Sequence, residues 1–153
     1  MSSIEIQPLA SYPELVEICA AWNLNEFGAS EDWGLEELTG ALRGIIEKDS
    51  GELALIAHCD GLPAGFVLLI ECDLESHSHL KPWLASLVVA RPFQRRGIGR
   101  ALVAAIEAAA ARRGDKELFL YSSIPDYYRP LGWHFLEELE KEDRRFEIMS
   151  KRL

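Results

Sequence analysis

Residues 85–111, ASLVVARPFQRRGIGRALVAAIEAAAA, decide the fold of this chain. The apolar run at 87–89 predicts a short buried strand. From Ile98 onward, apolar residues recur at the spacing of one helix face. They are Ala101, Leu102, Ala105, Ile106 and Ala109. Gly97 and Gly99 therefore lie at the point where a strand becomes a helix.

This strand-to-helix junction has the chemistry of an anion-binding site. The first amides of a helix lack partners inside the helix, and the helix dipole favours anions at that end. Glycine lets the backbone approach a ligand closely. Four arginines lie around the two glycines, although the chain has a formal net charge of -9. They are Arg91, Arg95, Arg96 and Arg100. We expect a phosphate or diphosphate on this loop.

The spacing of the loop excludes two common phosphate motifs. A P-loop needs a Lys-Ser/Thr pair after its second glycine, and a dinucleotide motif needs G-x-G-x-x-G with a later acidic residue. The pattern here is Gln-x-x-Gly-x-Gly, formed by Gln94, Gly97 and Gly99. Taken alone, it is also compatible with an ordinary strand, loop and helix that carries surface arginines.

The pattern resembles the signature of the GNAT superfamily of acyl-CoA-dependent N-acetyltransferases, Gln/Arg-x-x-Gly-x-Gly/Ala. The resemblance implies that the loop amides hold the diphosphate of acetyl-CoA. The residues concerned are Gln94, Arg95, Arg96, Gly97, Ile98, Gly99 and Arg100. It also implies that the backbone of Leu87, Val88 and Val89 pairs with the pantetheine arm, and that an amide near Val89 holds the thioester carbonyl oxygen. Arg91 replaces a proline that is common in the family, which changes the local turn.

A second motif, Tyr128-x-x-x-Gly132-Trp133, resembles the Tyr-x-x-x-Gly-Phe of the same family. By that resemblance, Tyr128 contacts the cofactor sulfur and protonates the leaving thiolate as a general acid. The alternative is that Tyr128 and its neighbour Tyr127 only pack a short helix. An asparagine that often binds the cofactor in the family is absent here, so either the hydroxyl of Ser123 takes its place or this contact is missing.

The general base is less well defined by the sequence. Glu71 and Asp73 are predicted to end the third strand, beside the strand that leads into the glycine loop. Either carboxylate could accept the proton of the amine, and either could be a solvated charge at a strand end. His77 and His79 lie in a predicted surface loop, and Ser86 is a weaker candidate. No Cys/His/carboxylate spacing indicates a metal.

Composition limits the class of protein. The chain has 153 residues, 48% hydrophobic and 27% charged, which is ordinary for one soluble domain over residues 1–153. A pI of about 4.9 disfavours a nucleic-acid partner. No apolar run reaches the roughly 20 residues of a membrane span, and no secretory signal is evident. Cys19, Cys59 and Cys72 form no disulfide pattern, so we expect a protein of the reducing cytoplasm. The expected assembly is a monomer or a homodimer.

The order of the predicted elements resembles that of the GNAT fold over nearly the whole chain. The resemblance implies an α/β (α+β) fold with a mixed, mostly antiparallel sheet of about six to seven strands, splayed between the fourth and fifth strands, with helices on both faces. Residues 23–33 are predicted to be a loop, and in the family this region lines the acceptor pocket. Phe27, Asp32 and Trp33 are candidates there, whereas Trp22 continues a helical stripe toward the core.

These features favour a cytoplasmic N-acetyltransferase that uses acetyl-CoA as co-substrate and a primary amine as acceptor, without a metal. Two alternatives stay open. One is a non-catalytic acyl-CoA-binding sensor, which would need no tyrosine acid. The other is a phosphate-binding module unrelated to CoA.

Overall fold

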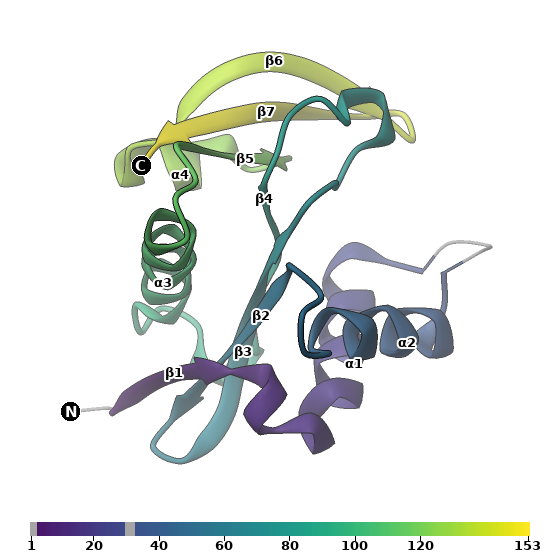
Figure 1. Ribbon diagram of the computed structural model, residues 1–153, viewed down its shortest axis with the longest axis vertical. Coiled ribbons are helices and arrows are strands. Elements are labelled where there is room, and N and C mark those ends of the chain that lie inside the picture. The colour runs from purple at the N-terminus through teal and green to yellow at the C-terminus, as the bar shows by residue number, and fades with distance from the viewer. Residues whose placement is uncertain (1–2, 30–32) are drawn as a thin grey trace.

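The computed structural model describes residues 3–29 and 33–153, and within them seven strands form one sheet in the order β1-β2-β3-β4-β5-β7-β6 (Figure 1). The strands are β1 Ile4–Pro8, β2 Leu53–Cys59, β3 Leu62–Ile70, β4 Trp83–Val89, β5 Glu117–Ser122, β6 His134–Lys141 and β7 Arg144–Arg152. The α-helices are α1 Val16–Phe27, α2 Leu35–Ile45, α3 Ile98–Arg112 and α4 Pro125–Tyr128. All neighbouring strands are antiparallel except β4 and β5.

Helices cover both faces of the sheet, as predicted (Figure 1). The apolar stripe of α3 packs on one face through Leu102, Val103 and Ile106, in a core that extends from β2 to β7. On the opposite face, α1 and α2 cover β2, β3 and β4. Strands alternate their side chains between faces, so the central strands supply apolar residues to both layers.

The first helix is longer than predicted. We expected a loop to begin at Asn23, but α1 continues to Phe27 and ends where Gly28 adopts a φ of 85°. Asn25 and Glu26 continue the helix because they lie on its exposed side, where a break in the apolar pattern costs little. Trp22 packs toward the core and stacks on Phe66, with ring centroids 6.4 Å apart. Phe27 and Trp33 are exposed, and Asp32 lies outside the described residues.

The third strand is shorter than predicted, since it ends at Ile70 and leaves both Glu71 and Asp73 in the connection that follows. This connection contains a 3₁₀ turn at Glu75–His77, and it is not only a surface loop.

In this connection, Leu74 is buried against Trp83, Phe119 and Ile148, and these four residues form a third core cluster. Because Leu118 and Leu120 face α3, the alternate residue Phe119 faces away from it. The connection thus covers the side of the C-terminal strands that α3 leaves open.

The sheet is nearly divided between β4 and β5. Trp83 opposite Phe119 is the one paired position between these strands in the described residues, with the Phe119 amide donating to the Pro82 carbonyl at 3.1 Å. Beyond that position the strands diverge toward Val89 and Ser122, which confirms the predicted splay. No helix within residues 3–29 and 33–153 combines the length and the apolar character that crossing a membrane requires.

Candidate active site

The loop between β4 and α3 is held in a sharply turned conformation. The Gln94 side-chain amide donates to the carbonyl of Val89 at 3.1 Å, which ties the loop to the end of β4. Arg95 and Gly97 have φ angles of 65° and 82°. Two left-handed residues so close together turn successive amides toward one side, as in other anion-binding loops. The guanidinium of Arg96 lies 5.6 Å from the ring centre of Phe93 and stabilises the turn.

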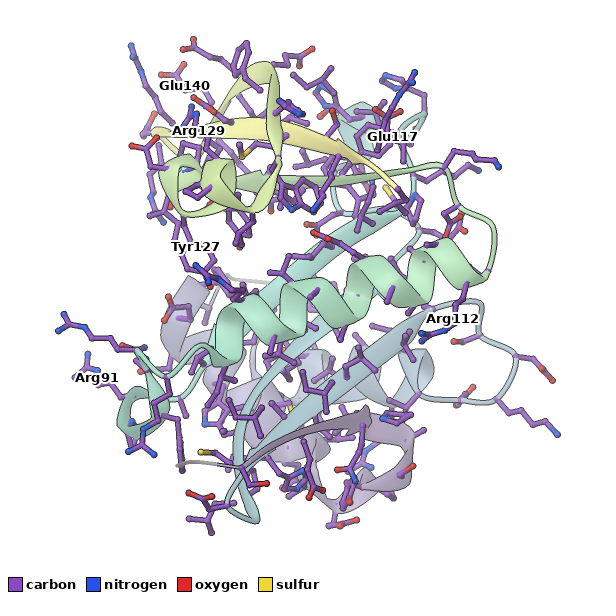
Figure 2. The ribbon with its side chains drawn as sticks, turned by 90° about the vertical axis from the view of Figure 1, so that its left-hand side faces the viewer. Arg91, Arg112, Glu117, Tyr127, Arg129 and Glu140 are labelled. Atoms are coloured by element: carbon purple, nitrogen blue, oxygen red, sulfur yellow. The ribbon has the colours of Figure 1, made fainter. Side chains whose placement is uncertain are left out.

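The start of α3 is open to a ligand. Its first helical hydrogen bond runs from the Ala101 amide to the Gly97 carbonyl at 3.1 Å, so the amides of residues 98–100 have no partner within the helix. Ile98 and Gly99 are buried, whereas the arginine side chains are exposed. Figure 2 shows Arg91 extending away from the loop that precedes α3. The structure therefore brings the predicted loop residues together as one positively charged, amide-lined surface.

The second half of β4 presents an unpaired edge toward β5. Ser86 has a φ of 53° and forms a bulge, because Leu68 pairs with Ala85 while Phe66 pairs with Val88. A bulge bends its strand and changes the direction of the backbone groups that follow. A Cβ at Gly65 would lie 2.5 Å from the Val88 carbonyl oxygen, so β3 approaches β4 very closely here. Leu87, Val88 and Val89 follow the bulge, and within residues 3–29 and 33–153 no strand pairs with their edge toward β5.

The two tyrosines of α4 have different surroundings. Tyr128 is 7% exposed and packs edge-to-face against Trp133, with ring centroids 6.3 Å apart. Burial raises its pKa, and the neighbouring Tyr127 adds to the rise. Tyr127 is 41% exposed and reaches toward the start of α3 (Figure 2). Both phenols are therefore protonated at neutral pH and can donate a proton or a hydrogen bond.

A polar cluster that sequence reasoning missed holds α4 in place. One Glu107 carboxylate oxygen accepts from the Trp133 indole at 3.1 Å, and the other accepts from the Lys151 ammonium at 2.9 Å. Lys151 also donates to the Leu131 carbonyl at 2.7 Å. Glu107 lies on α3 and Lys151 on β7, so this cluster fixes the segment behind Tyr128 from two sides. Glu107 is the one charged residue between Arg100 and Arg112, beside the apolar stripe of α3, which is the signal that could have indicated it.

The two candidate bases differ sharply. Asp73 is partly buried, and desolvation raises its pKa from 3.8 to about 6, although the Lys141 ammonium acts in the opposite direction. Lys141 donates to the Tyr121 hydroxyl at 3.1 Å, so Asp73 faces an ordered polar pair.

Glu71 is exposed and pairs with Lys81 at 3.8 Å. Glu71 follows Ile70, which pairs with Trp83 at the closed end of the splay. Along β4, Trp83 lies six residues, or about 20 Å, from Val89.

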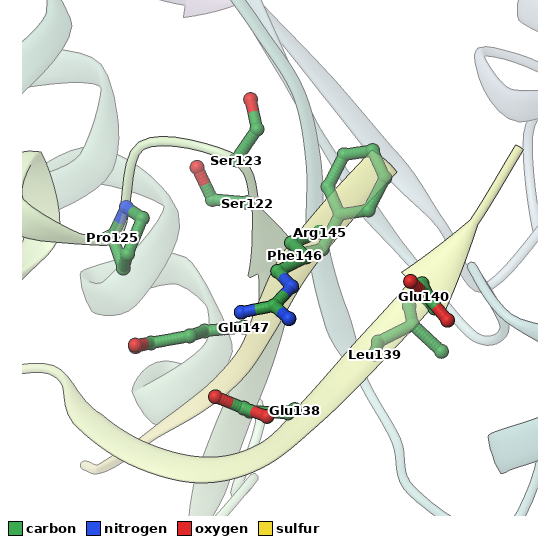
Figure 3. Close-up of a pocket in the computed structure, with 9 residues that line it drawn as sticks. All are labelled: Ser122, Ser123, Pro125, Glu138, Leu139, Glu140, Arg145, Phe146 and Glu147. Carbon is green, nitrogen blue, oxygen red and sulfur yellow. The ribbon is translucent and has the colours of Figure 1, made fainter. Parts of the chain in front are cut away.

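A cavity of about 460 Å³ opens beside the end of β5, on the side where β6 and β7 begin their hairpin (Figure 3). Ser123 lies at its rim, and Ser122 accepts a hydrogen bond from the Ile124 amide at 2.9 Å. The lining is rich in carboxylates. It comprises Ser122, Ser123, Pro125, Glu138, Leu139, Glu140, Arg145, Phe146 and Glu147. A second, smaller cavity shares Leu139 and Glu140 and continues to Asp73. A carboxylate-lined cavity of this kind favours a cationic ligand.

The histidine candidates take part in contacts of the β3–β4 connection. His77 hydrogen-bonds Glu137 through Nε2 and Ser76 through Nδ1, and its ring stacks on that of His79. These contacts tie the connection to β6. In the part of the chain that the structure describes, no three His, Cys, Asp or Glu residues are grouped so that they could hold a metal ion.

Comparison with known proteins agrees with this geometry. Residues 12–133 match the model of the acetyltransferase (GNAT) family. An aminoglycoside 6'-N-acetyltransferase complexed with coenzyme A aligns with a TM-score of 0.76 and 17% identity, covering 97% of this chain and 96% of the other. The aminoglycoside 6'-N-acetyltransferase of Enterococcus faecium gives 0.74 and 17%, with the same coverage.

A third similar structure is the PaiA N-acetyltransferase of Thermoplasma acidophilum, also in complex with coenzyme A. It aligns with a TM-score of 0.65 and 23% identity, covering 99% of both chains. No curated protein sequence matches this chain. The family match spans most of the chain, so the protein belongs to the GNAT acetyltransferase family. The fold and enzyme class expected from the two motifs are thereby confirmed.

Proposed function

We propose that this protein transfers an acetyl group from acetyl-CoA to a primary amine, by direct attack within a ternary complex. The observation that carries the proposal is the continuous path from the unpaired edge of β4 to the open amides at the start of α3. An extended pantetheine arm carries amide groups, so it can pair with Leu87, Val88 and Val89 as a missing strand would. Its diphosphate then reaches the amides and arginines of residues 94–100.

During acetyl transfer, negative charge develops on the carbonyl oxygen and on the departing sulfur, while the attacking amine must lose a proton. The backbone amide near Val89 would hold the carbonyl oxygen as it becomes negative. Tyr128, fixed against Trp133, would give its proton to the departing thiolate. Ser123 would contact the cofactor from the end of β5. These roles follow from the resemblance to the family and from the position of each residue around the splay.

Asp73 is the better candidate for the general base. A carboxylate with a pKa of about 6 is mostly deprotonated at neutral pH and still basic enough to accept a proton from an amine through water. Glu71 is exposed to solvent and pairs with the Lys81 ammonium, so its carboxylate lacks the desolvation that makes Asp73 more basic. We therefore propose Asp73 for this role and retain Glu71 as a control.

The acceptor would approach through the carboxylate-lined cavities on the side of Asp73 and Glu138. Aminoglycosides and other amines are cationic at neutral pH, which suits the charge of this surface. Phe27 and Trp33 are exposed beside the segment between α1 and α2, and they could contact an acceptor there. The similar aminoglycoside acetyltransferases make cationic amines the first group to test.

The proposal also covers the domain organisation of the protein, its location and its partners. We propose that residues 1–153 act as one domain in the cytoplasm, as a monomer or a homodimer, with no nucleic-acid or membrane partner. The second candidate function is a non-catalytic acyl-CoA sensor. Retention of a buried phenol behind the splay favours the enzyme, because binding alone would not require an acid.

Thermal shift with CoA and with ATP tests the cofactor assignment. We expect CoA to raise the melting temperature and ATP to leave it unchanged, since only bound ligand stabilises the folded state. Gly97→Glu places a carboxylate and a strained φ in the anion site and should abolish the CoA shift. Normal CoA binding by this variant would refute the loop assignment. Release of free CoA in the presence of a panel of amines then separates the enzyme from the sensor.

A further inference from the structure

The phenol of Tyr127 lies directly against the first turn of α3. A Cβ built on Gly99 would lie 2.4 Å from the Tyr127 hydroxyl oxygen, and 3.6 Å from Cγ2 of Val89. The Tyr127 hydroxyl can lie at this position because Gly99 has no side chain to exclude it. That position is the corner where β4 ends and α3 begins, at the mouth of the splay.

The ring of Tyr127 is held in place from behind. It packs edge-to-face on Tyr128, with centroids 5.0 Å apart and planes at 82°, and Tyr128 in turn packs on buried Trp133. The outer side of Tyr127 is open to solvent (Figure 2). A donor that is already ordered loses little conformational freedom when it meets a ligand.

The surroundings of this hydroxyl favour an anionic partner. Burial raises the pKa of Tyr127, and the guanidinium of Arg100, on the first turn of α3, lowers it by less. The phenol thus stays a hydrogen-bond donor at neutral pH. The free amides of residues 98–100 point from the same helix end, and the helix dipole adds to their effect.

We propose that Tyr127 is a further cofactor-binding residue, whose hydroxyl donates a hydrogen bond to a diphosphate oxygen of acetyl-CoA bound at the start of α3. This inference rests on the proposed function. It assigns neighbouring phenols to two parts of one cofactor: Tyr127 to the diphosphate and Tyr128 to the sulfur. Tyr127 lies outside the Tyr-x-x-x-Gly spacing, which is why sequence reasoning did not assign it.

Removing the hydroxyl tests the inference. Tyr127→Phe should raise the Kd for CoA, measured by calorimetry, about tenfold, the scale of a hydrogen bond to a charged group. Acetyl-pantetheine has the same thioester arm without the diphosphate, so its kcat/KM should be equal in the variant and the wild type. Tyr12→Phe is the matched control, because that ring packs beside His58 at 4.7 Å in the N-terminal half and should leave the Kd unchanged.

A double-mutant cycle with Gly99→Ala gives an independent readout. The family signature allows alanine at this position, so the loop itself should tolerate the methyl group. In the wild-type background the new Cβ displaces the Tyr127 hydroxyl, and we expect a severalfold weaker Kd for CoA. In Tyr127→Phe the nearest ring carbon is 3.6 Å away, an ordinary contact, so Gly99→Ala should add little further loss.

The outcomes separate this inference from the function on which it rests. Wild-type protein that fails to bind CoA would refute the proposed function. If the wild type binds CoA and Tyr127→Phe binds it equally well, only the role of Tyr127 is refuted. Equal losses with CoA and acetyl-pantetheine would also refute it, because they would indicate that the hydroxyl only supports the structure.

Discussion

Replacing Asp73 by asparagine should make the folded protein more stable at neutral pH while removing its proton acceptor. The side chain is nearly isosteric, so the main change is the loss of a titrating group. Desolvation raises the pKa of Asp73 to about 6, against 3.8 for an ordinary aspartate. The folded state therefore holds the proton more tightly than the unfolded state does.

The sign and size of the effect follow from this difference. The contribution of Asp73 to the free energy of unfolding is greatest below pH 3.8, falls as the pH rises from 3.8 to about 6, and stays low above that. At about 1.4 kcal/mol for each pKa unit, the ionised carboxylate costs about 3 kcal/mol at pH 7. Asp73→Asn should recover an amount of that order at pH 7, equivalent to roughly 5–10 °C in Tm, and almost nothing at pH 3.5.

Urea denaturation at several pH values, together with pH profiles of kcat/KM, provides the assay. The wild-type profile should rise with pH through about 6, and the variant should lose both that rise and about 10²-fold or more in rate. Glu71→Gln is the matched control, since its exposed carboxylate should change stability by less than about 0.5 kcal/mol and leave the profile intact. A variant with wild-type stability at pH 7 and an unchanged profile would show that Asp73 is an ordinary solvated carboxylate.

Two further variants test the groups around α4. Tyr128→Phe should bind CoA normally and lose turnover by about 10²-fold, measured at saturating acetyl-CoA, and unchanged turnover would make Tyr128 a packing residue. Glu107→Ala leaves the Trp133 indole and the Lys151 ammonium without their shared acceptor, and should lower the free energy of unfolding by about 2–3 kcal/mol in urea. Glu107→Gln should recover part of that loss, and equal stability of the alanine variant and the wild type would refute the role given to this cluster.

The central part of the fold could be predicted from the sequence because local and global signals agree there. The strand over 87–89, the glycines at 97 and 99 and the helical stripe from Ile98 each predict the same strand-loop-helix unit, and the structure has it. The boundaries near Asn23 and Asp73 were wrong for a physical reason. Periodicity reports which residues are buried, and it says little where a helix continues along a solvated face or a strand ends before a packed connection.

The candidate site was predictable only where backbone geometry carries the function. Gly97 and Arg95 lie between β4 and α3, as their spacing predicts, while their contact with a cofactor stays a prediction. Tyr127 and Glu107 depend on contacts between distant elements: Tyr127 meets the start of α3, and Glu107 meets β7 and Trp133. The spacing of residues within one segment of the sequence does not predict contacts between elements that are distant along the chain. The difference between Glu71 and Asp73 likewise comes from desolvation, which appears only in the folded chain.

The near-division of the sheet at Trp83 and Phe119 has a mechanical consequence. The two half-sheets share one paired position, although α3 packs on both of them. On our proposal, the pantetheine arm pairs with the free edge of β4 and adds the backbone hydrogen bonds that the sheet lacks there. We therefore expect this part of the sheet to open less often while acetyl-CoA is bound than after CoA has left.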